Sequence, residues 1–125
     1  MSFTDDRFPG LSIPHPNVMQ EVRGNIFYGE RVSIGPWARF VIPENSSLRL
    51  GSDVYLGYHV EIGPSHGGIV IGDRATIQDR CVLLGDVEIG RYCVFSLNIY
   101  ISSGRHYYKE TPHLLIRDQD KMVLR

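Results

Sequence analysis

Large aliphatic and aromatic residues recur every six positions through most of this sequence. Thirteen residues keep that spacing in three runs: Val22, Tyr28, Ile34 and Phe40; Leu50, Leu56 and Ile62; and Ile71, Ile77, Leu83, Ile89, Phe95 and Ile101. A helix with 3.6 residues per turn would rotate these side chains away from one face within two repeats. Plain strand alternation does not account for the Gly or Asp that interrupts each short run. The period therefore predicts a short strand, a corner and another short strand, repeated along the chain.

The residues between the large ones are also ordered. Glycine directly follows several large residues, in the pairs Ile34-Gly35, Leu56-Gly57, Ile62-Gly63, Ile71-Gly72 and Ile89-Gly90. A small or β-branched residue stands four positions after many of them: Val32, Ala38, Val54, Val60, Ala75, Cys81, Val87 and Cys93. We expect the large side chain to point inward, the small one to pack just before the corner, and Gly or Asp to adopt the positive φ of the corner. Three such units close a triangular coil of eighteen residues, in which residue n stacks on residue n+18 at about 4.8 Å.

Eighteen-residue stacking keeps the interior apolar, as in the pairs Ile71 with Ile89, Ile77 with Phe95, and Leu83 with Ile101. The period breaks in the stretches 43–47 and 64–68, whose Pro, Ser, Asn and Gly are typical of loops. The sequence thus predicts an all-β fold, a parallel β-helix of four to five coils over residues 22–103. An irregular N-terminal arm or cap at 1–21 and a loop and tail at 104–125 flank it. A β-sandwich is the alternative, but its turns, about 8–12 residues apart, would not keep a six-residue phase.

The composition excludes several classes of protein. Hydrophobic residues make up 42% and charged residues 22%, which favours a packed domain over a disordered chain. The formal net charge of −1, with Lys and Arg scattered, gives no basic surface for a nucleic-acid backbone. No apolar run is long enough for a membrane span, and the first residues lack the features of a secretion signal. Two cysteines make no disulfide framework, so we expect a cytoplasmic protein with reduced thiols.

Four motifs share an aliphatic residue, a glycine, two variable residues and a small residue: Ile34-Gly-Pro-Trp-Ala38, Leu56-Gly-Tyr-His-Val60, Ile71-Gly-Asp-Arg-Ala75 and Ile89-Gly-Arg-Tyr-Cys93. They resemble the repeats of the bacterial hexapeptide-repeat acyltransferases, and the resemblance covers roughly residues 22–103. It implies a left-handed parallel β-helix and a homotrimer. It also implies transfer of an acetyl or other acyl group from CoA to a hydroxyl or amine of a sugar or related acceptor. Acetyl-CoA or another acyl-CoA is then the co-substrate, and no metal is expected.

The segment Ile99–His106 resembles the place where sugar O-acetyltransferases of this family leave the coil for a loop that carries their catalytic histidine. The sequence independently favours a departure here, because the six-residue register would put Arg105 at a small inward position. We therefore expect the chain to leave the coil at Gly104, with His106 on a loop at the rim. A histidine there suits a general base. Ser103 and Gly104 are expected to contact the substrate.

Other interpretations of these residues stay open. Asp86, one coil below Gly104, is either a turn residue or a substrate-binding residue that orients the imidazole or holds an acceptor hydroxyl. Residues 71–84 also resemble the γ-class carbonic anhydrases, but Leu84 stands at the position of a zinc ligand and offers no ligand atom. A β-helix can also act without chemistry, as a trimerisation or assembly module or as a ligand-binding module. The chain is alternatively a fragment of a longer transferase.

Several further side chains carry their own expectations. Cys81 and Cys93 occupy small inward positions, which predicts buried free thiols. His59 stands at an outward position and His66 lies in the second break of the period, which predicts exposed histidines. Four aromatic residues also fall at outward positions: Trp37, Tyr55, Tyr58 and Tyr92. Exposed aromatic side chains favour an interface between copies of the chain.

Overall fold

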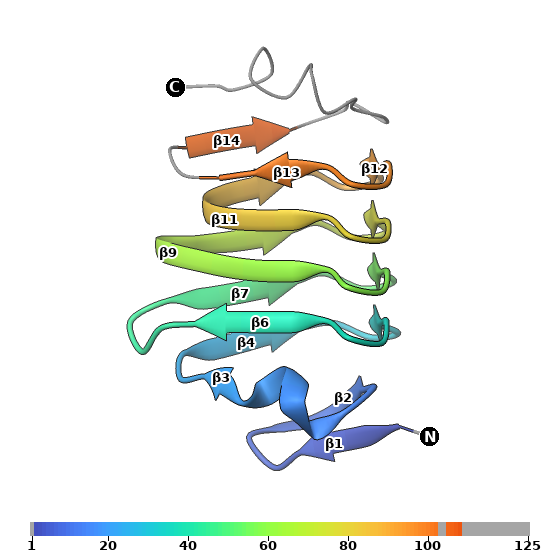
Figure 1. Ribbon diagram of the computed structural model, residues 1–125, viewed down its shortest axis with the longest axis vertical. Coiled ribbons are helices and arrows are strands. Elements are labelled where there is room, and N and C mark those ends of the chain that lie inside the picture. The colour runs from blue at the N-terminus through green and yellow to red at the C-terminus, as the bar shows by residue number, and fades with distance from the viewer. Residues whose placement is uncertain (1, 103–104, 109–125) are drawn as a thin grey trace.

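The computed structural model describes residues 2–102 and the backbone of residues 105–108 (Figure 1). Its strands are β1 (Phe3–Asp5), β2 (Phe8–Ile13), β3 (Glu21–Val22), β4 (Asn25–Tyr28), β5 (Ser33–Ile34), β6 (Arg39–Ile42), β7 (Ser47–Leu50), β8 (Tyr55–Leu56), β9 (Glu61–Ile71), β10 (Thr76–Ile77), β11 (Val82–Ile89), β12 (Val94–Phe95), β13 (Tyr100–Ile101) and β14 (Arg105–Tyr108). The short 3-10 helix η1 (Pro16–Met19) lies between β2 and β3. The fold is all-β, as the six-residue period predicts.

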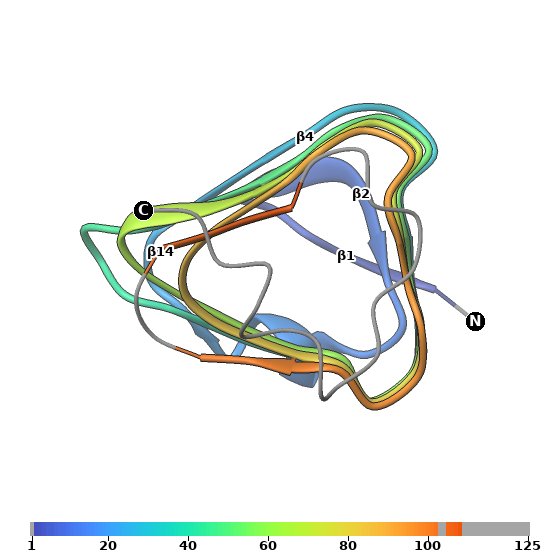
Figure 2. The same ribbon diagram turned by 90° about the horizontal axis from the view of Figure 1, so that it is seen from above.

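From β3 onward the chain winds around one axis as a three-sided coil of about four turns (Figure 2). In Figure 1 the front strands β6 and β13 run to the left, and the rear strands β4, β7 and β14 run to the right as the chain climbs. This sense of rotation makes the coil a left-handed parallel β-helix. The handedness is unusual, because connections between parallel strands are right-handed in most proteins.

The strands of successive turns stack into parallel sheets. One sheet has the order β12-β10-β8-β5 and forms one face of the coil. The larger sheet has the order β13-β11-β9-β6-β3 on the front. Because β9 and β11 continue around one corner, the same sheet includes β14, β7 and β4 on the rear. That corner, between the front and rear faces, is called the loop corner below.

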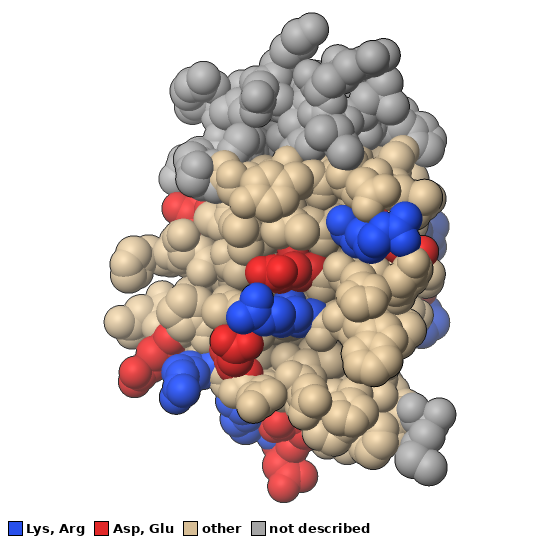
Figure 3. All heavy atoms as spheres, in the orientation of Figure 1, with Lys and Arg blue, Asp and Glu red and all other residues tan. Residues whose placement is uncertain are grey.

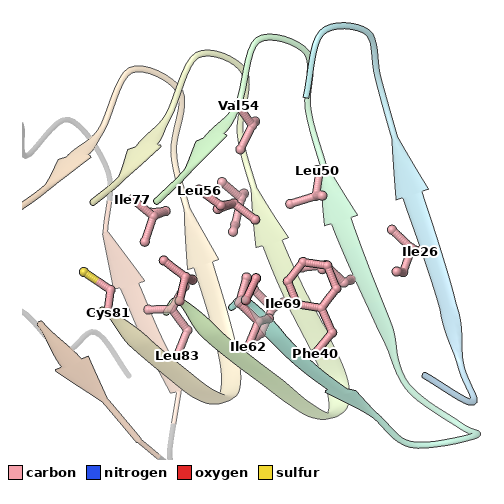
Figure 4. Close-up of a cluster of buried hydrophobic side chains, with 14 of the residues drawn as sticks. Ile26, Phe40, Leu50, Val54, Leu56, Ile62, Ile69, Ile77, Cys81 and Leu83 are labelled. Atoms are coloured by element: carbon pink, nitrogen blue, oxygen red, sulfur yellow. The ribbon is translucent and has the colours of Figure 1, made fainter. Parts of the chain in front are cut away.

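The core fills the inside of the coil with columns of large apolar side chains (Figure 4). The three stacked pairs expected from the sequence are confirmed by the strand register: Ile71 with Ile89, Ile77 with Phe95, and Leu83 with Ile101. Phe40 and Phe95 are the bulkiest fully buried side chains. Burial of each such side chain contributes about 1.5–3 kcal/mol, so the columns are the main source of stability.

The expectation that Gly or Asp adopts the positive φ of each corner is wrong at seven of the eight non-glycine positions. Those residues are Arg31, Trp37, Asp53, His59, Arg74, Arg80, Tyr92 and Asn98, and each directly precedes a residue that packs at the corner. The glycine after each large residue has another purpose. A Cβ on Gly57 would lie 2.8 Å from the backbone N of Asp79 in the next turn. Glycine is needed there because successive turns approach closely.

Residues 1–21 were expected to form an irregular arm or cap, and most of them instead form regular elements that cover the first turn. Strands β1 and β2 form an antiparallel hairpin, and η1 follows it beneath the first turn (Figure 1). Leu11, Ile13 and Met19 are buried against the core. The Arg7 guanidinium donates to the carbonyl oxygens of Val22 and Met19 and so ties the hairpin to the coil. The apolar residues of the hairpin cover a strand edge that would otherwise be exposed.

The expected loop after Gly104 is also wrong for the described backbone. Residues 105–108 form β14, which pairs in parallel with Asp86–Ile89 of β11. Ile101 still pairs with Leu83, eighteen residues back, whereas Arg105 pairs with Asp86, nineteen residues back. One additional residue at the loop corner therefore shifts the register, and the coil continues because β14 satisfies the hydrogen-bonding groups of β11. Ser103 and Gly104 lie outside the described residues.

Candidate functional site

Asp86 lies at the loop corner, where β11 passes from the front to the rear face. The pairing of β11 with β9 shifts between Gly85 and Val87, and Gly85 has a positive φ of 98°. The Asp86 Oδ1 accepts a hydrogen bond from the backbone N of Gly67 at 2.9 Å. A Cβ on Gly67 would lie 2.8 Å from the Asp86 carboxylate carbon, so glycine leaves the room for this contact. Asp86 therefore fixes the loop of the turn below, and its second oxygen can accept further hydrogen bonds.

Two loops project at the same corner, and they are the two breaks of the period. The second, residues 64–68, is not a separate element, because strand β9 continues through it. Figure 2 shows the chain extending outward here, farthest in the turn that follows β6. Ser46 is buried, and its hydroxyl donates to the carbonyl oxygen of Ser65 in the loop of the next turn. His66 is exposed, as expected. The two loops are therefore held against each other and form one side of the corner.

Strand β14 brings the backbone of the expected catalytic residue to this corner. The register pairs His106 with Val87 and Arg105 with Asp86. Two of the expected site residues, His106 and Asp86, are thus close in the fold although twenty residues separate them in the sequence. The other two, Ser103 and Gly104, fall outside the described residues.

The two thiols lie inside the coil and away from this corner. Cys81 and Cys93 are buried and are not joined by a disulfide, as the sequence predicts. Burial raises the pKa of the Cys81 thiol, which favours an unreactive neutral thiol. Within residues 2–102, no three His, Cys, Asp or Glu side chains gather in a way that could hold a metal ion.

A polar ladder on the front face was not predicted from the sequence. Arg39 bonds to Glu21 in the turn below at 3.2 Å and to Glu61 in the turn above at 3.3 Å. Figure 3 shows acidic and basic side chains alternating along this face. The hydrogen bond to Glu21 raises the pKa of the Arg39 guanidinium, which therefore keeps its positive charge. The signal was present in the spacing, because opposite charges recur eighteen and twenty-two residues apart.

Comparisons with protein families, with curated proteins and with solved structures found no match to this chain. In the part of the chain that the structure describes, no helix has the length and hydrophobicity of a membrane span. The fold and the loop corner are therefore the evidence that bears on function.

Proposed function

We propose that this protein transfers an acyl group from an acyl-CoA to a hydroxyl or amine of a sugar or related acceptor, with His106 as general base. The observation that carries the proposal is the pairing of β14 with β11, which brings the backbone of His106 beside that of Val87 and next to Asp86. The loop at 64–68 is fixed to the same corner by Asp86. The hexapeptide pattern and the left-handed coil agree with the family that the motifs resemble.

The proposed reaction needs one proton acceptor and one donor to an oxyanion. The His106 imidazole takes the proton of the acceptor hydroxyl or amine while that atom forms a bond to the thioester carbonyl carbon. Collapse of the tetrahedral intermediate breaks the carbon–sulfur bond, and the CoA thiolate receives the proton from the imidazolium. Backbone N–H groups at Ser103 and Gly104 are proposed to stabilise the oxyanion. The second carboxylate oxygen of Asp86 is proposed to hold the acceptor or to orient the imidazole.

A homotrimer is part of the proposal, and one face of the coil supports it. The outward side chains of the sheet β12-β10-β8-β5 are Ser33, Tyr55, Thr76 and Val94, which carry no charge over four turns. Tyr55 is 47% exposed. The front face, by contrast, carries the ladder of Glu21, Arg39 and Glu61 described above. An uncharged, flat face with an exposed aromatic ring suits packing against other copies. We propose a cytoplasmic location, where acyl-CoA is available.

The experiment has a binding step and a turnover step. Calorimetry measures acetyl-CoA binding, and sedimentation of the same sample gives the oligomeric mass. Release of free CoA thiol is then followed over a panel of mono- and disaccharides. We expect micromolar binding by a trimer, turnover with at least one sugar, and loss of turnover by at least a hundredfold in His106→Ala. His66→Ala, which removes an exposed histidine at the same corner, is the matched control and should retain turnover.

Two results would remove the proposal. Unchanged turnover in a folded His106→Ala protein would exclude this histidine as the base. A folded trimer that does not bind acetyl-CoA would instead favour an assembly module built on the same β-helix. Circular dichroism of each variant shows that lost activity is not lost folding.

A further inference from the structure

The only tryptophan of the chain, Trp37, is the most exposed large hydrophobic residue among those described, at 73%. It lies at the corner between β5 and β6, with a φ of 63°. The corner position directs the side chain away from the core, which the adjacent Ala38 helps to fill. Packing of the core therefore does not explain a large aromatic ring here. Left-handed φ values in bulky residues are uncommon and cost of order 1–3 kcal/mol, so the ring is held at the surface at a cost.

One face of the indole is supported by the next turn of the coil. The His59 ring stacks on Trp37 with a centroid distance of 6.2 Å and an interplanar angle of 16°. The Tyr58 ring in turn contacts the His59 ring edge-on, with a centroid distance of 5.1 Å. Arg80, one turn farther, lies 5.6 Å from the Tyr58 ring and donates to Asn98 at 2.9 Å. The stack fixes the orientation of the indole, most of whose surface stays exposed.

Polar side chains follow Trp37 at the start of the front face. Arg39, two residues after Trp37 and the first residue of β6, is the centre of the ladder that Glu21 and Glu61 complete. These planar side chains offer both hydrogen-bond donors and acceptors on the face that begins at the Trp37 corner. The ladder has two carboxylates and one guanidinium, and Arg80 in the aromatic stack adds a second guanidinium, so the charges of this surface balance. A surface without excess positive charge does not attract phosphorylated ligands and accepts neutral ones.

We propose that Trp37, supported by His59, binds a pyranose ring of a neutral saccharide. A pyranose presents a flat face of C–H groups and a rim of hydroxyls. The flat face matches the exposed indole, and the rim matches the Arg39 ladder, so both parts of the ligand have a partner. The corner is separate from the loop corner, and this binding does not depend on the proposed acyl transfer.

The test uses the fluorescence of Trp37, which reports the site directly because the chain has no other tryptophan. Maltohexaose, cellohexaose and chitohexaose are titrated separately, with adenosine diphosphate as the phosphorylated comparison. We expect a saturable change in intensity or emission wavelength with at least one oligosaccharide and none with the nucleotide. Calorimetry supplies the affinity for variants that lack the indole.

Three variants separate binding from folding, and each introduces Asn, which tolerates positive φ better than other residues with a side chain. Trp37→Asn should abolish the binding. His59→Asn should weaken it about threefold to tenfold, because the ring loses its stacked support. Tyr92→Asn is the matched control, since Tyr92 is 59% exposed with a φ of 65° at another corner, and it should leave binding unchanged.

Any of four results would overturn the proposal. The first is no fluorescence response to any of the three oligosaccharides at millimolar concentration, and the second is a Trp37→Asn variant that binds as tightly as the parent protein. The third is a loss of affinity in Tyr92→Asn equal to or greater than that in Trp37→Asn. The fourth is tighter binding of adenosine diphosphate than of the oligosaccharides. A change of oligomeric mass in Trp37→Asn would also overturn it, because the ring would then lie between copies of the chain.

Discussion

Gly57 and Gly63 offer a test of how closely successive turns of the coil approach. Both glycines directly follow a large inward residue, and neither has a positive φ. They differ in what a methyl group would meet. At Gly57 the added Cβ would lie 2.8 Å from the backbone N of Asp79 and also displace the Asp79 carboxylate. At Gly63 the nearest atom is the Cδ2 of Leu84, at 2.9 Å, which is the end of a flexible side chain.

The two substitutions should therefore differ in free energy of unfolding. In Gly57→Ala, the backbone overlap costs about 1–3 kcal/mol. The hydrogen bond from Tyr58 N to Asp79 Oδ1, 3.0 Å long, is lost with it, at about 1.5–3 kcal/mol. Against this, Ala lowers the entropy of the unfolded chain by about 0.4–1 kcal/mol. The expected loss is about 3 kcal/mol.

Gly63→Ala should be nearly neutral. A rotamer change of Leu84 costs about 0.5–1.5 kcal/mol. The lower entropy of the unfolded chain with Ala, described above for Gly57→Ala, offsets most of this cost. Thermal unfolding followed by circular dichroism measures both, with roughly 4 °C of melting temperature per kcal/mol in a chain of this size. Gly57→Ala should melt about 12 °C below the parent protein and Gly63→Ala within about 4 °C. Equal shifts in the two variants would refute the inference that the main chain is in contact at this corner.

Two further predictions concern pH. Burial raises the Cys81 pKa above its ordinary value of 9.0, so just above pH 9.0 the thiol ionises in the unfolded chain and not in the folded one. The free energy of unfolding should therefore fall as pH rises, by up to about 1.4 kcal/mol per pH unit. Urea unfolding between pH 8 and 10 measures this pH dependence, which Cys81→Ala should remove. The hydrogen bond from Arg7 lowers the Asp5 pKa below 3.8. The contribution of the Asp5 carboxylate to the free energy of unfolding is therefore present above pH 3.8 and is lost as the pH falls through the lowered pKa. Asp5→Asn should cost under about 1 kcal/mol at pH 7, because the pair is partly exposed, and a difference that persisted well below pH 3.8 would contradict this cause.

The interior of the coil was predictable because it depends on one spacing. Large residues six apart must all face inward for the chain to bury them, and the strand register confirms the pairs that follow, such as Ile77 with Phe95. The corners were not predictable in the same way. Their φ values depend on backbone geometry that an exposed side chain does not report, so Trp37 and Arg80 adopt positive φ where Gly or Asp was expected.

The ends of the coil depend on contacts that a repeat does not encode. The N-terminal hairpin has no six-residue period, yet its apolar side chains cover the first turn, including that of Leu11. At the other end, Arg105 breaks the pattern of small inward residues, which suggested a loop. The register instead shifts by one residue and pairs Arg105 with Asp86. For the candidate site, the eighteen-residue spacing placed Asp86 one coil below the segment that carries His106, but it did not predict that Asp86 bonds to Gly67.

All changes of repeat length in this coil occur at one corner. The number of residues per turn follows from the strand pairing on the front face. It is twenty-two from Arg39 to Glu61, twenty-one from Glu61 to Val82, and eighteen from Val82 to Tyr100. The other two corners keep the same number of residues in every turn. Insertions at the loop corner therefore leave the triangular cross-section of the coil and the stacking at its other two corners unchanged. This edge of the molecule is free to diversify in sequence and length, as the hypervariable loops of an antibody do on a constant scaffold. A new recognition surface could be grafted between Ser65 and Gly68 without redesign of the core.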